Sequence, residues 1–419
     1  MLLDDFLRSI NMHPEQTDID KTAESILSEM NKGLKGEASS IQMIPTFIAA
    51  EGKAPENAPV IAIDAGGTNL RVGLVTFSDG EPRLSRFEKC PVPGSYGTIS
   101  ADDFFSELAD KILPLTAESD TIGFCFSYPA EIFPNRDGRI LQLNKELSVS
   151  GAEGKIIGEE LIRKLKDAGV SKPLRFTLLN DTVAGLMGGL ATLRLSHCDG
   201  LAGLILGTGY NTCYIERGAR IEKLCSSHDM IINCESGIFN KALRGRSDEL
   251  VDAASAIPND HWLEKMLSGA YHGGVISRTA ALAQNAGLLS EAFKEGFKEF
   301  TTPELDDFLR GADNRVSKMC VGDDRELLTA IIDRSFERAA RLVCANILAL
   351  CLQVDGGKSE ARPFCVVAEG STFHNSLLFK STLQRLLNDH VKEKRSRHII
   401  CVQAENSTMA GTALAALLN

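Results

Sequence analysis

Two stretches of this chain share one hydrophobic pattern: an apolar run, a short polar break with glycine, and a second apolar run. In the first stretch, residues 60–63 are apolar, and Asp64-Ala65-Gly66-Gly67-Thr68-Asn69 separates them from the apolar residues Leu70, Val72, Leu74, Val75 and Phe77. In residues 201–218, the break is Gly207-Thr208-Gly209. Buried strands joined by glycine turns have this pattern. We therefore predict two similar hairpins, one in each half of the chain.

The rest of the chain alternates between helical and strand-like patterns. Helical spacing occurs in the first fifty residues, over 102–113 with Asp102 near the N-cap, over 154–168, from Thr182 onwards, and over 334–352. Buried strands are predicted at 121–129 and 174–181, at the start of 362–375, and at the start of 398–418, which ends in a helix of small residues. This alternation indicates an α/β fold.

Composition narrows the class of protein. The 419 residues suffice for two domains, and 43% apolar and 24% charged content is typical of a globular protein. A net charge of −11 argues against nucleic acid and anionic membranes as partners, although an acidic protein can still bind ATP through a local loop with Mg²⁺.

Cysteine usage and the N-terminal segment predict a cytoplasmic location. The eleven cysteines are scattered without a CxxC pair, which is typical of buried thiols in a reducing compartment. The segment MLLDDFLRSINMH lacks the apolar core of a signal peptide, and no stretch approaches the ~18 apolar residues of a membrane helix.

The polar breaks carry the candidate chemistry. A carboxylate, a hydroxyl and exposed N–H groups side by side could hold a phosphate and its Mg²⁺. For either loop alone, an ordinary glycine hairpin is an equally good interpretation. Two such loops facing one another across a cleft would hold a polyphosphate from both sides.

Six motifs together resemble one family. DAGGTN (64–69), FSYP (126–129), LNDT (179–182), GTGYNTCY (207–214), NCESG (233–237) and EGS (369–371) follow in the order of the hexokinase family. The resemblance implies a two-lobed actin-like ATPase (ribonuclease H-like) fold with a cleft between a small and a large domain. The implied parts are a helical segment 1–58 on the large domain, a small domain 59–180 completed by helix 407–419, and a large domain 181–406.

The same resemblance assigns chemistry to two acids. Asp181 matches the general base that accepts the proton of the 6-hydroxyl of a hexose, although an Asp at this point is also a common helix N-cap. Asp64 matches the acid that holds Mg²⁺ through water. ATP and Mg²⁺ are therefore the expected cofactors.

The implied binding residues form two sets. The ATP set is Asp64, Gly66, Gly67, Thr68, Asn69, Arg71, Gly207, Thr208, Gly209, Gly370, Ser371, Ser407 and Gly411. The sugar set is Ser127, Asn144, Lys145, Asn180, Asp181, Asn211 and Glu235.

Three positions depart from the family pattern. Asn144 precedes Lys145 where Thr is usual, and Ser236 stands where Trp is usual. In SGAYHGGVIS (268–277), a second sugar-binding glutamate aligns with Gly274, unless a neighbour such as His272 makes that contact. The identity of the sugar is therefore open.

The predicted function is ATP-dependent phosphorylation of a hexose, most simply glucose, at the 6-hydroxyl by a hexokinase/glucokinase-type phosphotransferase. The alternatives are a kinase for another hexose or an amino sugar, and a sugar-binding regulator with little turnover. The retained Asp64 and Asp181 favour an enzyme. The expected partners are the sugar and ATP, with no nucleic acid and no membrane; a homodimer is compatible with the sequence.

Overall fold

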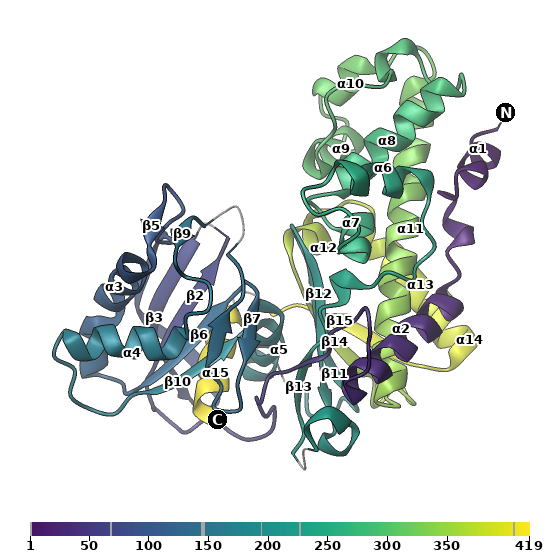
Figure 1. Cartoon of the computed structure of the whole chain (residues 1–419). Helices are drawn as coiled ribbons and strands as arrows, with labels where there is room; N and C mark the ends of the chain where they lie inside the picture. The colour runs from purple at the N-terminus through teal and green to yellow at the C-terminus, as the bar shows by residue number, and fades with distance from the viewer. Residues whose placement is uncertain (1, 68, 144–146, 194, 226–227, 405–406) are drawn as a thin grey trace. The chain divides into compact units, whose positions relative to one another are not determined.

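The computed structural model describes residues 2–67, 69–143, 147–193, 195–225, 228–404 and 407–419, which form two compact units (Figure 1). The first unit is Met1–Met43, His197–Thr212 and Cys234–Val402, and the second is Ile44–Ser196, Cys213–Asn233 and Gln403–Asn419. The chain passes between units within strand β12 (Tyr210–Glu216). These bounds differ from the expected domains, since helix α5 (Asp181–Thr192) falls in the second unit. The expected domain assignment stays a prediction.

The second unit is built on a five-stranded sheet in the order β10-β6-β2-β3-β4. Strands β2, β6 and β10 are parallel, and β3 is antiparallel to β2 and β4. The three parallel strands therefore end at the same edge. The strands are β2 (Val60–Gly66), β3 (Asn69–Ser78), β4 (Glu81–Pro91), β6 (Thr121–Phe126) and β10 (Arg175–Leu179).

Helices cover both faces of this sheet. Helices α3 (Ala101–Ile112) and α4 (Ile157–Asp167) pack through Phe104, Phe105 and Leu161 onto the core residues of β2, β3 and β6. Helix α15 (Ser407–Leu418) contacts β2 and β6 and packs along α5. The shorter strands of this unit are β1 (Ile44–Pro45), β5 (Ile99–Ser100), β7 (Ala130–Ile132), β8 (Gly138–Ile140), β9 (Val149–Ser150) and β13 (Met230–Asn233).

The first unit combines parallel strands with many helices. Strand β14 (Phe364–Glu369) lies between β11 (Leu201–Leu206) and β15 (Ile399–Val402), parallel to both. The 30-residue helix α11 (Asp324–Gln353) packs on α2 (Ile19–Lys35) and α13 (Phe379–Leu386). The other helices are α1 (Leu3–Ser9), α6 (Arg246–Ala254), α7 (Trp262–Leu267), α8 (His272–Asn285), α9 (Thr302–Leu309), α10 (Arg315–Met319), α12 (Ser371–Asn375) and α14 (Glu393–Arg395).

Most predicted elements are confirmed, with local corrections. The strands at 60–66 and 69–78 form the predicted hairpin. The helices predicted at 102–113, 154–168 and 334–352 overlap with α3, α4 and α11, respectively. The helix predicted from Thr182 begins at Asp181, and its N-cap is Asn180. No helix of the described residues is long and apolar enough to cross a membrane.

Asp102 lies near the N-cap of α3, as predicted. The cap itself is Ser100, because its hydroxyl accepts a hydrogen bond from the Asp103 backbone N–H at 3.1 Å. We expect Ser100→Ala to lower the free energy of unfolding by about 1 kcal/mol, the usual cost of a lost cap. Asp102→Ala, which leaves the cap intact, is the control. Urea unfolding measures both, and an equal loss for the two variants would contradict the assignment.

Candidate active site

Two carboxylates and a hydroxyl lie at the carboxyl edge of the parallel strands of the second unit. Asp64 lies near the carboxyl end of β2, and Ser127 follows β6. Asp181 is the first residue of α5, which comes after β10. The Ser127 hydroxyl donates a hydrogen bond to the Asp181 carboxylate. Ligands of open α/β sheets bind at such an edge. The sequence-predicted trio is therefore brought together within this unit.

The helix cap leaves the Asp181 carboxylate available for chemistry. The Asn180 side-chain oxygen accepts a hydrogen bond from the Thr182 backbone N–H at 2.9 Å, so Asn180 is the N-cap of α5. The Thr182 N–H is shared with Asp181 Oδ1 at 2.7 Å. The N-cap of α5 is therefore Asn180 and not Asp181, and the role of Asp181 as a general base stays a prediction.

Burial sets the electrostatics of both acids. Burial raises the pKa of Asp181, and the hydrogen bonds from Thr182 and Ser127 oppose that rise only in part. Burial also raises the pKa of Asp64, the charge of Asp181 adds to the effect, and the Arg71 guanidinium opposes it from 3.2 Å. A carboxylate with a raised pKa is a better proton acceptor than an ordinary one.

The turn after β2 presents backbone groups. Gly67 has φ +53°, in the left-handed region that favours glycine, and its carbonyl accepts the Tyr128 hydroxyl at 2.7 Å. A Cβ on Gly66 would lie 3.5 Å from Ser127 Oγ, so this turn lies against the carboxylate group. Asn69 opens β3 and is exposed. Thr68, like Asn144 and Lys145, lies outside the described residues.

Two residues of the predicted ATP set are explained by helix packing. A Cβ on Gly411 would lie 2.0 Å from the Ala184 carbonyl oxygen, so glycine is required where α15 crosses α5. Ser407 is also buried, and its hydroxyl oxygen would lie 2.6 Å from a Cβ on Gly188 of α5. The geometry of these described residues gives their proposed contact with adenosine no support.

In the first unit, the loop between β11 and β12 is held from several sides. The Gly207 carbonyl accepts the Gly269 backbone N–H at 2.8 Å and the Thr372 hydroxyl at 3.0 Å, and the Thr208 carbonyl accepts the Ala270 N–H at 3.2 Å. Gly207 and Thr208 make these contacts through their backbone carbonyl oxygens. A Cβ on Gly209 would lie 2.8 Å from Glu264 Oε2, so a side chain there would displace that carboxylate.

Two polar side chains meet next to this loop. The Asn211 amide donates to Glu235 Oε1 at 3.3 Å, and Asn211 Oδ1 accepts the backbone N–H of Thr212 and Ser236. Glu235 has φ +57°, a strained conformation for a non-glycine residue, which recurs at functional sites. Asn211 and Glu235 are thus brought together as predicted.

Glu264 of α7 is a buried carboxylate beside this loop that the sequence analysis did not single out. Its Oε2 accepts the Tyr210 backbone N–H at 2.9 Å and lies 3.5 Å from a Cβ placed on Gly237, two residues after Glu235. Burial raises the pKa of Glu264. The available signal was a Glu-Lys pair inside the otherwise apolar helix Trp262–Leu267.

Gly274 does not face this polar cluster. It is buried near the start of α8, where a Cβ would lie 3.2 Å from Glu299 Oε2 and 3.7 Å from a Val251 methyl carbon. His272 is also turned away: it packs on Phe336, and burial lowers its pKa to about 4. A different carboxylate, Glu264, lies beside the Gly207–Gly209 loop.

We expect Gly274→Glu to leave the sugar specificity and the KM for the sugar unchanged, because the new side chain would point towards Glu299. Steady-state kinetics on a panel of hexoses checks this, with the unfolding temperature as a control for folding. A tenfold lower KM for glucose would show instead that position 274 reaches the sugar.

One pocket lies beside some of the predicted site residues. In the first unit, a cavity of about 450 Å³ lies beside the loop at 207–209 and the start of α12. Gly370 precedes α12 with φ +109°. A side chain is excluded at this position because a Cβ would lie 2.3 Å from the Leu206 carbonyl oxygen. The cavity is lined by the predicted Gly207, Thr208 and Ser371 and by residues that the sequence did not indicate, Gly269, Ala270, Thr302, Pro303, Asp306, Asp307, Arg310, Thr372, Asn375 and Ser376.

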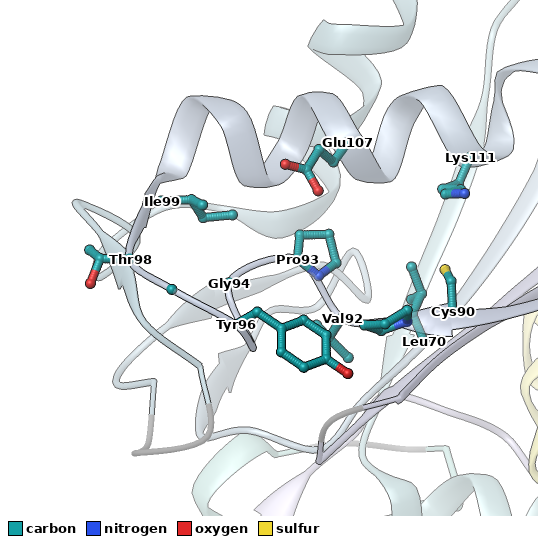
Figure 2. A pocket seen from close by; sticks show the side chains of 12 residues that line it. Leu70, Cys90, Val92, Pro93, Gly94, Tyr96, Thr98, Ile99, Glu107 and Lys111 are labelled. Carbon is teal, nitrogen blue, oxygen red and sulfur yellow. The ribbon is translucent and has the colours of Figure 1, made fainter.

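Another pocket, of about 480 Å³, belongs to the second unit (Figure 2). Glu107 and Lys111 of α3 line one wall, and the 86% exposed Tyr96 lines the opposite one. Its lining contains none of the sequence-predicted site residues.

Comparisons with known proteins agree with this arrangement. Two family models match, both described as hexokinase, one over residues 3–190 and one over residues 201–418. Hexokinase-2 of Oryza sativa subsp. japonica is 27% identical over 94% of this chain and 87% of its own, and Hexokinase-2 of Candida albicans is 28% identical with the same coverage. The solved hexokinase of Schistosoma mansoni, complexed with glucose, covers 99% of this chain and 98% of its own with a TM-score of 0.79 at 22% identity.

Proposed function

This chain belongs to the hexokinase family, and we propose that it transfers the γ-phosphoryl group of ATP to the 6-hydroxyl of glucose. Hexose phosphorylation with ATP follows from the family, while glucose as the sugar and the role of each residue are our proposals. The observation that carries the mechanism is the partly buried Asp181 carboxylate, fixed by Ser127 and Thr182 at the carboxyl edge of the sheet.

Asp181 acts as the general base. As the 6-hydroxyl oxygen attacks the γ-phosphorus, the carboxylate accepts the hydroxyl proton, and ADP leaves. A positioned base contributes roughly 10²–10⁴ in rate, and positioning and charge stabilisation supply most of the rest. The Ser127 hydrogen bond holds the carboxylate in one orientation, which avoids a search among rotamers at the moment of transfer.

Asp64 and the turn after β2 are proposed to hold the phosphates. Mg²⁺ is usually bound by one or two carboxylates together with substrate phosphates, and Asp64 offers such a carboxylate beside a glycine turn. Bound Mg²⁺ would neutralise charge on the β- and γ-phosphates. Backbone N–H groups of Gly66, Gly67 and Thr68 and the Arg71 guanidinium would add donors, and Asn69 stays in this set as predicted.

Each unit is proposed to offer polar side chains suited to sugar hydroxyls. These are Ser127, Asn180 and Asp181 in the second unit, and Asn211, Glu235 and Glu264 in the first. Carboxylates and amides suit a ring of hydroxyls because each can accept or donate more than one hydrogen bond. Asn144 and Lys145 keep their predicted place in this set.

The nucleoside is proposed to bind in the 450 Å³ cavity of the first unit. Its lining combines Gly207, Thr208 and Ser371 with the flat, small surface of Gly269 and Ala270. Arg310 stands at its wall, held by Asp306 at 3.0 Å and by the Asn375 carbonyl at 2.8 Å. A planar base suits a cavity in which backbone atoms can come close to it and a guanidinium is held in one position.

One assay separates this proposal from its alternatives. The purified chain is given ATP, Mg²⁺ and, in turn, glucose, fructose, mannose and N-acetylated amino sugars, and ADP release is followed. The highest kcat/KM for glucose supports the proposal. A higher value for another sugar identifies a different hexose or amino sugar kinase, and sugar binding by calorimetry without ADP release identifies a regulator.

A further inference from the structure

A buried thiol lies between the two catalytic-site acids of the second unit. Cys125 is on β6 directly opposite Asp64 of the parallel strand β2 and is fully buried. Its thiol lies within hydrogen-bond reach of the Asp64 carboxylate and of the Ser127 hydroxyl. A small apolar residue would fill this place equally well, so the polar contact is what distinguishes cysteine here.

The direction of these hydrogen bonds follows from the chemistry of the groups. An ionised carboxylate only accepts, so the S–H of Cys125 donates to Asp64. The single Ser127 proton is best used on the Asp181 carboxylate, since a charged acceptor binds it more strongly than a thiol sulfur. Each acid thus receives one donor from β6, Asp64 from the thiol and Asp181 from the hydroxyl.

We propose that Cys125 is a positioning residue that holds the Asp64 carboxylate in the orientation needed to bind Mg²⁺·nucleotide. Arg71, which also donates to Asp64 at 3.2 Å, has a side chain that is 41% exposed and can move away. The thiol is fixed by its strand, so it keeps one oxygen of Asp64 in place when the guanidinium turns towards a phosphate. This inference rests on the proposed role of Asp64.

The test compares Cys125→Ala with Cys125→Ser. The two variants have nearly the same volume, so they leave nearly the same cavity, and only Ser keeps a donor. We expect Cys125→Ala to raise the Mg²⁺ concentration for half-maximal activity about three- to tenfold, with the KM for glucose changed less than twofold. Cys125→Ser should recover most of that loss. Cys344→Ala, which removes a buried thiol of α11, is the control and should behave as the wild type.

A binding measurement separates this inference from the proposed function. Calorimetry of Mg²⁺·ADP with the sugar-free protein should give the same order, with Cys125→Ala weaker than Cys125→Ser. If that order holds while no variant phosphorylates a sugar, the proposed function fails and the positioning role stands. Equal weakening in both variants, or no change in Cys125→Ala, overturns the positioning role. If Cys125→Ala does not fold, Cys125→Val, which fills the site without a donor, replaces it.

Discussion

An Asp181→Ala variant is expected to phosphorylate glucose about 10²- to 10⁴-fold more slowly than the wild type, with the loss in kcat. The variant keeps the Asn180 cap of α5, so the helix and the sheet edge remain in place. What it loses is the carboxylate that accepts the proton of the attacking hydroxyl. Stopped assays of sugar phosphate over a long incubation measure rates in this range.

Controls separate chemistry from folding and nucleotide binding. Calorimetric binding of Mg²⁺·ADP should change less than twofold in Asp181→Ala, and Asp167→Ala, which removes an exposed acid at the end of α4, should keep full activity. Because burial raises the pKa of Asp181, kcat of the wild type should fall as the pH drops towards that raised pKa and the base becomes protonated. Near-normal turnover in Asp181→Ala would remove this residue from the mechanism.

A Glu264→Ala variant is expected to raise the KM for glucose about tenfold to a hundredfold. Hydrogen bonds to charged groups are worth roughly 1.5–3 kcal/mol, and each 1.4 kcal/mol corresponds to a factor of ten. The variant also frees the Tyr210 N–H beside the Gly207–Gly209 loop. Glu264→Gln keeps an oxygen for that N–H and removes only the charge, so its KM should lie between those of the wild type and Glu264→Ala.

The pH response gives a second readout of Glu264. Because burial raises its pKa, acid protonates this side chain earlier than an exposed glutamate, and the KM for glucose should rise as the pH falls. Glu264→Gln should lose this part of the pH dependence. Glu299→Ala, which removes the carboxylate that faces Gly274, is the matched control with an unchanged KM. An unchanged KM in Glu264→Ala would place this carboxylate outside the sugar site.

The hairpins and the place of Asp64 and Asp181 in the fold were predictable because their patterns are local. Apolar runs on both sides of a glycine turn specify β2 and β3, and a polar Asn-Asp pair at the end of a buried strand specifies where α5 begins. Strand β4 was not predicted, since most of its residues are exposed and its sequence lacks an apolar alternation. Its place is set by pairing with β3, which no local pattern encodes.

The remaining differences come from tertiary packing. Gly411 suggested a ligand contact, yet a glycine at a tight helix crossing has the same local sequence signature. The position of Glu264 could not be predicted because its hydrogen-bond partner, Tyr210, lies 54 residues earlier in the chain. The alignment of a second sugar-binding glutamate with Gly274 stays a prediction, because the contacts of α8 show only that a Cβ there would lie against Glu299.

The most direct test of the central claim is to identify the product. The purified chain is incubated with ATP, Mg²⁺ and glucose, and the mixture is examined by ³¹P NMR. The account predicts a phosphomonoester on the C6 oxygen, formed in equal amount to ADP, and its near absence with Asp181→Ala. ADP with inorganic phosphate and no sugar phosphate, or a sugar phosphate formed equally fast by Asp181→Ala, would contradict it.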